Sequence, residues 1–348
     1  MANIPKTMRA VGLNEHLPID NPSSLLDLVI DVPTISGREI LVQIKANGVN
    51  PADYKLRREP GEFTAPKVLG FDAAGVVAAV GPDVTLFKVG DEVYYVGPFT
   101  GLGANAEYQA VDERLVALKP SSLTFAEAAA LPVTTLTAYD SIFYRLGVSK
   151  ADPRVTSPTK KAVLILNGSG GVGSIAIQLL KELTDVTVIA SASRPQSSAW
   201  VTELGADHVV NHAEDIPKQL AAIGIPQVDY ILVFTDLPPH FTTIAEVIKP
   251  QGKICAITPI TEDLPFQNLF FKSITFVWET LATRMILDVD DRIVHHRVLT
   301  EVRELVDAKR LRSIVGEDFG VINAANLKKA HAALEGGHVV GKIVLSGF

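Results

Sequence analysis

The sequence predicts an α/β protein of two domains, in which a β-rich part is followed by a doubly wound parallel sheet. Two observations predict this fold class. The first part, to about residue 125, contains stretches such as 39–46, where apolar and polar side chains alternate as in a half-buried strand. From about Thr124 to residue 280, apolar strands alternate with helical segments, which is typical of a parallel sheet covered by helices on both faces.

The elements can be placed in order along the chain. In the β-rich part, two more strands are expected at 75–81 and 91–96, because glycine-containing turns flank them. Helices are expected at 125–131 and 135–145, and a Pro- and Thr-rich loop at 152–161. The length of 348 residues is enough for about two domains.

Six strands can be counted in the second part, the number in a full dinucleotide-binding fold built from two mononucleotide halves. They are expected at 163–166, 186–190, 208–210, 230–234, 253–257 and 273–277. Helices between them are expected at 197–204, 213–223 and 241–248. The chain then continues with an amphipathic helix at 298–309, a helix at 324–334 and a strand at 341–345.

A glycine-rich turn joins the first of the six strands to a helix. Gly168 permits a tight turn, Gly170 lets the backbone approach a pyrophosphate, and Gly173 lets the helix pack closely on the strand. The N–H groups at the helix start, with Gly171 and Val172, then face the anion. The sequence therefore predicts a dinucleotide site here, and the alternative is a tight turn with a purely structural role.

The second of the six strands indicates which dinucleotide is bound. An NAD-specific fold has an acidic residue at the end of this strand, but here the strand runs into Ser191, Ser193 and Arg194 with no Asp or Glu. Arg194 offers a planar fork of donors to a 2′-phosphate, and the two serines add hydroxyl groups. We therefore expect NADPH as the cofactor. The alternative is a solvated turn that happens to contain an arginine.

Composition excludes several classes of protein. The formal net charge of −7, from 32 basic and 39 acidic residues, argues against a general nucleic-acid surface. The single cysteine, Cys255, excludes an intrachain disulfide and a zinc site of several thiolates. No apolar run approaches the roughly 18 residues of a membrane span, and the first residues lack the apolar core of a signal peptide. We expect a cytoplasmic protein without membrane partners.

Several segments together resemble the medium-chain dehydrogenase/reductase superfamily over nearly the whole chain. They are 48–53, 69–77, 89–93, 130–139, the glycine turn and 341–345. The resemblance implies a GroES-like β-barrel catalytic domain of residues 1–126, completed by 284–348, and a six-stranded Rossmann domain of residues 127–283 that binds NADP(H). It also implies a cofactor cleft between the domains and a homodimer formed through the edge of the Rossmann sheet.

Three positions set the chain apart from the zinc enzymes of that superfamily. Asn50 stands in place of a cysteine ligand, Phe71 in place of a histidine ligand, and Val133 near the place of another cysteine. None can bind zinc as a thiolate or imidazole, so no metal is expected. The chain resembles the zinc-free, quinone-oxidoreductase-like branch, including a group labelled "zinc-type alcohol dehydrogenase-like".

The histidines are expected to have ordinary roles. His208 and His212 fall around a predicted strand and its loop, which favours structural roles over a metal pair. His295 and His296 are adjacent and are expected at the surface.

Without a metal, negative charge that develops on the acceptor oxygen must meet hydrogen-bond donors or be spread by the acceptor itself. Quinones and α,β-unsaturated carbonyls spread it through their π systems. The expected function is therefore NADPH-dependent reduction of quinones or α,β-unsaturated carbonyls by direct hydride transfer. The alternatives are an enoyl-thioester or alkenal double-bond reductase, and a non-catalytic NADPH-binding protein of the crystallin or RNA-binding kind.

The resemblance implies roles for individual side chains. Asn50 should face the nicotinamide and bind the ribose hydroxyl or the substrate oxygen, and its alternative role is to cap the turn before Pro51. Tyr54 is a candidate proton donor, or else packs in the core. Thr137 matches a threonine near the nicotinamide carboxamide, or else bonds to its own helix.

Other candidates depend on placement that the sequence does not give. Lys342 is expected to reach the cofactor phosphates, or else to lie on the surface. Asp53 and Asp72 are expected to be structural. Aromatic candidates for a substrate pocket, each with core packing as its alternative, are Phe63, Tyr94, Tyr95, Phe99 and Trp278.

Overall fold

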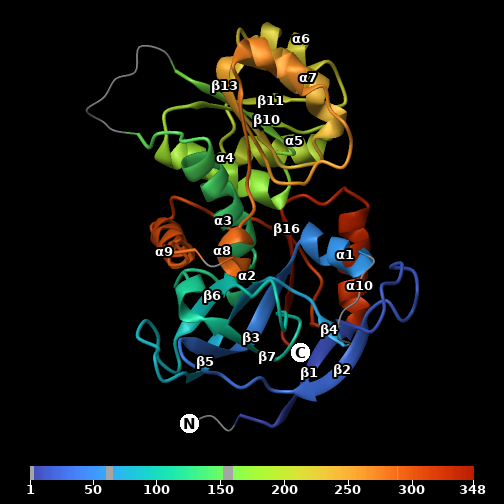
Figure 1. Cartoon of the computed structure of the whole chain (residues 1–348), viewed down its shortest axis with the longest axis vertical. Coiled ribbons are helices and arrows are strands. Elements are labelled where there is room, and N and C mark those ends of the chain that lie inside the picture. Colours follow the sequence, from blue (N-terminus) through green and yellow to red (C-terminus); the bar gives the residue numbers. More distant parts are fainter. Residues whose placement is uncertain (1–3, 60–65, 152–159, 288) are drawn as a thin grey trace. The chain divides into compact units, whose positions relative to one another are not determined.

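A computed structural model of the chain describes residues 4–59, 66–151, 160–287 and 289–348 (Figure 1). The chain divides into two compact units, which we call the first unit (Met1–Leu136 and Ala282–Phe348) and the second unit (Thr137–Leu281). The first boundary therefore falls after residue 136 rather than after residue 126, because α2 (Phe125–Ala129) packs on strands of the first unit. Most of the loop expected at 152–161 lies outside the described residues.

The first unit contains two β-sheets. In its described residues, the larger sheet has the strand order β15-β16-β3-β5-β6-β8 with β7 paired to β3, and the smaller has the order β2-β1-β4. The strands are β1 (Thr7–Leu13), β2 (Leu26–Asp31), β3 (Glu39–Val49), β4 (Lys67–Val68), β5 (Asp72–Val80), β6 (Glu92–Val96), β7 (Tyr108–Asp112), β8 (Val116–Leu118), β15 (Val315–Asp318) and β16 (Lys342–Ser346). The β-rich first part is thus as the sequence predicts.

The strand β16 joins this sheet from the far end of the chain (Figure 1). It runs antiparallel to β3, with Ile343 opposite Val49 and Val344 opposite Gly48. Ile40, Val42 and Val49 of β3 and Ile343 and Leu345 of β16 are buried in one core. The pairing therefore brings the residue before Ile343 next to the helix that follows β3.

Short helices complete the first unit. They are α1 (Pro51–Arg58), α2, α8 (Thr283–Ile286), α9 (Val294–Asp307), α10 (Ala324–Glu335) and the 3₁₀ turn η1 (Glu113–Leu115). α9 begins at Val294 and not at 298, so His295 lies on the helix face that carries Val298 and Val302 and is fully buried. The expectation of a surface position for His295 was wrong. His296 is half-buried, and its Nδ1 lies 2.7 Å from the carbonyl oxygen of Val116.

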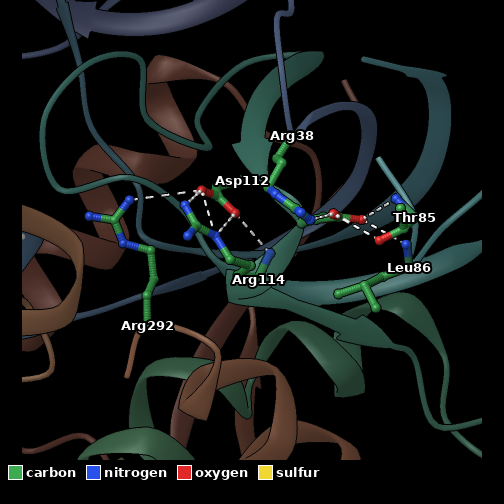
Figure 2. A network of polar contacts seen from close by, with 7 residues as sticks. Arg38, Thr85, Leu86, Asp112, Arg114 and Arg292 are labelled. Atoms are coloured by element: carbon green, nitrogen blue, oxygen red, sulfur yellow. Dashed lines mark hydrogen bonds and ion pairs between the residues drawn. The ribbon is translucent and has the colours of Figure 1, made fainter. Parts of the chain in front are cut away.

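Two adjacent carboxylates at the end of β7 hold loops of the first unit in place (Figure 2). Glu113 is fully buried, binds Arg38 at 2.7 Å and accepts two backbone N–H groups of the loop before β6 at 2.7 and 2.9 Å. Asp112 binds Arg114 and lies 3.8 Å from Arg292, which belongs to the C-terminal segment. A buried carboxylate with this many donors stabilises the fold and needs no catalytic explanation.

The second unit contains a parallel sheet with the strand order β11-β10-β9-β12-β13-β14. The strands are β9 (Ala162–Leu166), β10 (Thr187–Ser191), β11 (His208–Val210), β12 (Val228–Val233), β13 (Ile248–Ala256) and β14 (Thr275–Trp278). This is the 3-2-1-4-5-6 order of a full dinucleotide-binding fold, so the expected six strands and their arrangement are confirmed. β13 starts five residues before the predicted position, and the β12–β13 pairing has a register shift between Val228 and Tyr230.

Helices connect these strands. They are α3 (Pro132–Tyr139), which contains the first boundary, the π-helix η2 (Asp140–Arg145), α4 (Gly171–Leu183), α5 (Pro195–Glu203), α6 (Ile216–Ala222), η3 (Pro238–His240), α7 (Phe241–Val247) and η4 (Phe266–Lys272). No helix in the described part of the chain combines the length and the apolar character that crossing a bilayer requires.

Candidate functional site

The glycine turn of the second unit is packed so closely that two of its positions have no room for a side chain. Asn167 follows β9 with φ 62°, and the N–H of Gly168 donates to the carbonyl oxygen of Ser191 at 3.1 Å. A Cβ atom on Gly168 would lie 2.8 Å from the Cβ of Ala190, and one on Gly173 would lie 2.4 Å from the carbonyl oxygen of Asn167. Both positions therefore need glycine for close packing between β9, β10 and α4.

The start of α4 is open to an anion. Gly170 is the N-cap and has no side chain to bond the first amides of the helix. Gly170, Gly171 and Val172 are partly exposed, and parallel strands β9 and β10 end beside them. Free helix N–H groups at the carboxyl ends of adjacent parallel strands fit the pyrophosphate of a dinucleotide. The residues present therefore fit such a cofactor, which Gly168, Gly170, Gly171, Val172 and Gly173 would hold.

The three residues at the end of β10 that were expected to contact a 2′-phosphate differ in their exposure. Ser191 is 1% exposed, and its Oγ accepts the N–H of Asn167 at 3.0 Å, so its hydroxyl shapes the glycine turn. Ser191 therefore stabilises the glycine turn and, being buried, does not serve as the expected phosphate contact. Ser193 is exposed and Arg194 is half-buried at the N-cap of α5. The contact of these two residues with a 2′-phosphate stays a prediction.

His212 is a neighbour of Arg194 that the sequence analysis did not connect to it. β10 and β11 pair with Ser191 opposite Val210, so the segments that follow these strands leave the sheet side by side. Burial lowers the pKa of His212, and the charge of Arg194 lowers it further. His240 also has a pKa lowered by burial and then by the charge of His212. A guanidinium and two imidazoles whose pKa values are lowered thus follow three neighbouring strand ends, a pattern that strand spacing alone did not reveal.

In the first unit, a buried polar cluster joins Asn50, Asp72 and Lys342, and we call it the polar cluster. The Nδ2 of Asn50 donates to Asp72 Oδ2 at 2.8 Å, and Lys342 Nζ lies 2.6 Å from the same oxygen. Lys342 Nζ also donates to Asn50 Oδ1. The residues are 3%, 0% and 3% exposed. A buried ammonium that already binds two side chains has little reach, so we withdraw the expected phosphate contact of Lys342.

Asp53 lies next to the polar cluster and supports the start of α1. Its carboxylate accepts the N–H of Asn50 at 2.7 Å and the N–H of Gly70 at 3.0 Å. Burial raises the pKa of Asp53 to about 7, against the opposing effects of those N–H groups and of Lys342. Asn50 is the N-cap residue of α1 and Pro51 its first residue, and the link across this cap runs from the backbone N–H of Asn50 to Asp53, because the Asn50 side chain is bound to Asp72 and Lys342.

The other two expected catalytic residues are not joined to the polar cluster by a described contact. Tyr54 is half-buried in α1, one turn beyond Asn50. Thr137 is 6% exposed in α3 and is the first residue of the second unit. Their roles stay predictions.

The three positions that carry zinc ligands in related enzymes do converge in space. Asp72 links them, because its Oδ2 accepts from Asn50, its Oδ1 accepts the backbone N–H of Val133 at 2.7 Å, and it follows Phe71 directly. At these positions stand an amide tied to Lys342, a phenylalanine that precedes Asp72 in the chain, and a valine that approaches Asp72 through its backbone N–H. These groups do not fit zinc, which takes thiolate, imidazole or free carboxylate ligands. In the described segments, no three His, Cys, Asp or Glu side chains are grouped to hold a metal ion.

The aromatic candidates separate into core and exposed residues. Tyr94 and Tyr95 are fully buried, and the hydroxyl of Tyr94 donates to the carbonyl oxygen of Leu299 at 2.6 Å. Phe99 stacks on Phe71 with ring centroids 4.9 Å apart and an interplanar angle of 24°. Trp278 is 54% exposed. Phe63 lies outside the described residues.

Comparison with known proteins decides the family. The alcohol dehydrogenase GroES-like domain model matches residues 36–121, and the zinc-binding dehydrogenase model matches residues 171–287. The chain belongs to the medium-chain dehydrogenase/reductase superfamily. The GroES-like and Rossmann domains expected from the resemblance are therefore confirmed, and the protein is an oxidoreductase of this superfamily with a nicotinamide dinucleotide fold.

Members of the superfamily with similar sequences carry different names. A zinc-type alcohol dehydrogenase-like protein of Staphylococcus aureus is 40% identical over 97% of this chain and 100% of that protein. A chloroplastic NADPH-dependent alkenal/one oxidoreductase of Arabidopsis thaliana is 35% identical over 74% of this chain and 64% of that protein. The names therefore span zinc-type and alkenal-reducing members.

Solved structures of the superfamily share the fold of this chain. A protein of Rhizobium etli, titled as a candidate zinc-dependent alcohol dehydrogenase, is 44% identical with a TM-score of 0.93, and 99% of each chain is covered. The quinone oxidoreductase of Coxiella burnetii is 28% identical with a TM-score of 0.79 over 99% of this chain and 100% of that chain.

Proposed function

We propose that this medium-chain dehydrogenase/reductase reduces quinones or α,β-unsaturated carbonyls with NADPH and without zinc. The observation that carries the proposal is the convergence of the three lost zinc-ligand positions on the salt-bridged carboxylate of Asp72. With no Lewis acid at that place, charge on a simple carbonyl oxygen would have no metal to meet it. A conjugated acceptor spreads this charge over its own π system.

The stacked rings of Phe71 and Phe99 favour a flat acceptor. A phenyl ring takes the place of a metal-binding imidazole; Phe71 itself is buried and stacks on Phe99, so the partly exposed Phe99 supplies the aromatic surface. Conjugated rings and enones are planar and stack well on such a surface. The names of the Arabidopsis alkenal/one oxidoreductase and the Coxiella quinone oxidoreductase agree with this acceptor class.

NADPH is the proposed cofactor because the end of β10 carries Arg194 and no acidic residue. An acid there would repel a 2′-phosphate, whereas a guanidinium binds it with paired hydrogen bonds. His212, beside Arg194, adds a second group that gains charge when a phosphate dianion is near. When bound, the reduced nicotinamide supplies a hydride, and a proton from solvent or a side chain completes the reduction.

Tyr54 is our proposed proton donor to the acceptor. It lies in α1, four residues after Asn50, and is half-buried. A phenol in this setting can donate directly or through water. Thr137 is proposed as a contact of the nicotinamide carboxamide.

The test is NADPH oxidation with a matched panel of acceptors. A naphthoquinone and a 2-alkenal should be reduced, and the saturated aldehyde of the same length should not. NADPH should be preferred to NADH. Turnover of the saturated aldehyde that depends on added zinc would refute the proposal. Tight NADPH binding with no turnover of any acceptor would favour the non-catalytic binding protein.

We also propose that two copies of the chain pair through β14. This strand is at the outer edge of its sheet, Thr275 and Trp278 are exposed, and Phe270 and Phe271 just before it are 74% and 95% exposed. An open edge beside large apolar side chains invites strand pairing, and a second copy of the same edge satisfies it symmetrically.

Light scattering should give the mass of a dimer. Phe271→Asp should give a monomer, because it puts a charge into the proposed interface. Val29→Asp, at a position 73% exposed in the first unit, is the matched control and should stay dimeric. A wild-type monomer would refute the pairing.

We propose the cytoplasm as the location, which suits a chain whose single cysteine, Cys255, is buried and reduced.

A further inference from the structure

Lys342 is a buried ammonium to which the proposed reaction assigns no role so far. Its side chain is 4% exposed and forms an ion pair at 2.6 Å with Asp72, which is fully buried. Burying a lysine costs free energy unless it is paired and hydrogen-bonded. A hydrophobic residue in this place would be the less costly choice, so the ammonium calls for an explanation.

The backbone around Lys342 makes room for its side chain. Gly48 lies opposite Val344 in the β3–β16 pairing. A Cβ atom on Gly48 would lie 3.1 Å from Lys342 Cε and 2.5 Å from the carbonyl oxygen of Ala129. Because the neighbouring backbone could not yield, any larger residue at 48 would disturb the lysine. The strand pairing and the glycine together direct the ammonium to Asn50.

The ammonium and the carboxylate together define the orientation of the Asn50 amide. A side-chain amide carries an acceptor oxygen and a donor nitrogen, and turning it by half a revolution exchanges them. Lys342 can only donate, so it takes Oδ1, and ionised Asp72 can only accept, so it takes Nδ2. Either contact alone selects the same orientation. Val133 holds the other oxygen of Asp72 through its N–H group, which keeps the carboxylate from turning.

We infer that Lys342 is a positioning residue for the reductase site. Its buried ammonium group holds the Asn50 amide in one orientation. The inference rests on the proposed function together with the expectation from the sequence that Asn50 belongs to the reacting site. In this role Lys342 acts through Asn50 and touches neither the acceptor nor the cofactor. It replaces the phosphate contact that the sequence suggested.

The test is Lys342→Met, which keeps the length of the side chain and removes the charge. We expect kcat to fall roughly tenfold to a hundredfold, as for a misplaced active-site group, while the Kd for NADPH stays within about twofold. A phosphate contact would give the opposite result, a raised Kd with a weaker salt dependence. Asn50→Ala combined with Lys342→Met should lose no more activity than Asn50→Ala alone, because Lys342 acts only through Asn50. Independent, multiplying losses would overturn the inference.

Lys119 offers a matched control in the same unit. Its side chain is 5% exposed, and its Nζ lies 3.2 Å from Glu92 and 2.6 Å from the carbonyl oxygen of Leu123. Lys119→Met therefore also removes a buried, paired ammonium, but one that does not contact Asn50. It should lower the thermal midpoint and leave kcat unchanged. An equal fall of kcat in both variants would show that Lys342 acts only through stability.

A second readout does not require turnover. The two carboxamide protons of Asn50, read by NMR in the intact protein, should exchange with solvent at least about tenfold faster in Lys342→Met, because the amide loses its fixed partner. Unchanged exchange would overturn the inference even if the enzyme turns over. If the wild type reduces no acceptor, the proposed function fails and the exchange rates still decide the role of Lys342.

A double variant covers the case in which Lys342→Met does not fold. Lys342→Met leaves Asp72 as a buried charge without a cation, and such a loss can prevent folding. In that event Asp72→Asn combined with Lys342→Met removes both charges. The inference then expects the same faster exchange of the Asn50 carboxamide in the double variant, and protection equal to the wild type would refute it.

Discussion

Replacing His331 by leucine should remove part of the acid sensitivity of the first unit. His331 in α10 and His295 in α9 are fully buried, and neither has a hydrogen-bond partner for its ring nitrogens among the residues that the structure describes. Burial lowers the pKa of each imidazole from 6.5 to about 3, and the neighbouring charges of Arg57 and Arg284 lower it further. Both rings are therefore neutral in the folded protein.

The sign and size of the effect follow from these values. The unfolded chain binds more protons than the folded one between pH 6.5 and about 3, so this part of the stability is full above pH 6.5 and is lost as the pH falls. At pH 5, each histidine that gains its proton only on unfolding lowers the free energy of unfolding by about 2 kcal/mol. Two such residues remove about 4 kcal/mol, a large share of the roughly 5–15 kcal/mol that stabilises a domain.

Asp53 contributes to the pH dependence of the stability with the opposite sign. Its raised pKa of about 7 gives stability that is present at low pH and is lost as the pH rises from about 4 to 7. The wild-type curve mixes the two effects, but the difference between wild type and His331→Leu cancels the contribution of Asp53.

The assay is urea unfolding at pH 7.5, 6 and 5. His331→Leu should lose about 2 kcal/mol less than the wild type between pH 7.5 and 5. The exposed His338 gives the matched control, and His338→Leu should follow the wild type. If His331→Leu and the wild type lose the same free energy, the imidazole is not buried and neutral in the folded state, and the reasoning is wrong.

Three further predictions concern the cofactor and the acceptor. Arg194→Ala should weaken NADPH binding about tenfold to a hundredfold, or about 1.5–3 kcal/mol, and leave NADH binding nearly unchanged in a fluorescence titration; equal losses for both would remove Arg194 from the phosphate site. Activity should survive exhaustive chelation, and elemental analysis should find no stoichiometric zinc; loss of activity that added zinc restores would contradict this. Tyr54→Phe should lower kcat more than it weakens NADPH binding, whereas unchanged turnover would make Tyr54 a packing residue.

Local patterns in the sequence were enough to predict the strands and the glycine turn of the second unit. Its strands are short, apolar and separated by helices, so each can be recognised within about ten residues, and their number is that of a full dinucleotide-binding fold. The glycine turn is equally local, since Gly168 and Gly173 are required by contacts with residues of the adjoining strands.

Contacts between distant residues of the first unit could not be predicted from local patterns. Lys342 and Asn50 are 292 positions apart, and only the pairing of β16 with β3 brings them together. The role of Ser191 likewise depends on an N–H of the neighbouring strand end. His295 was misplaced because α9 begins a turn earlier than its apolar residues indicate. In each case the missing information was a contact between distant elements, which periodicity does not carry.

The place of β16 also bears on how the chain matures. The larger sheet of the first unit takes one of its inner strands from residues Lys342–Ser346, whereas the second unit uses the uninterrupted stretch Thr137–Leu281. During synthesis, the inserted domain can be complete while its host still waits for the last strand to leave the ribosome. The ammonium of Lys342 and the amide of Asn50 therefore meet only after the whole second unit has been synthesised, and removing residues 342–348 should leave the nucleotide-binding unit foldable and its host without a closed sheet.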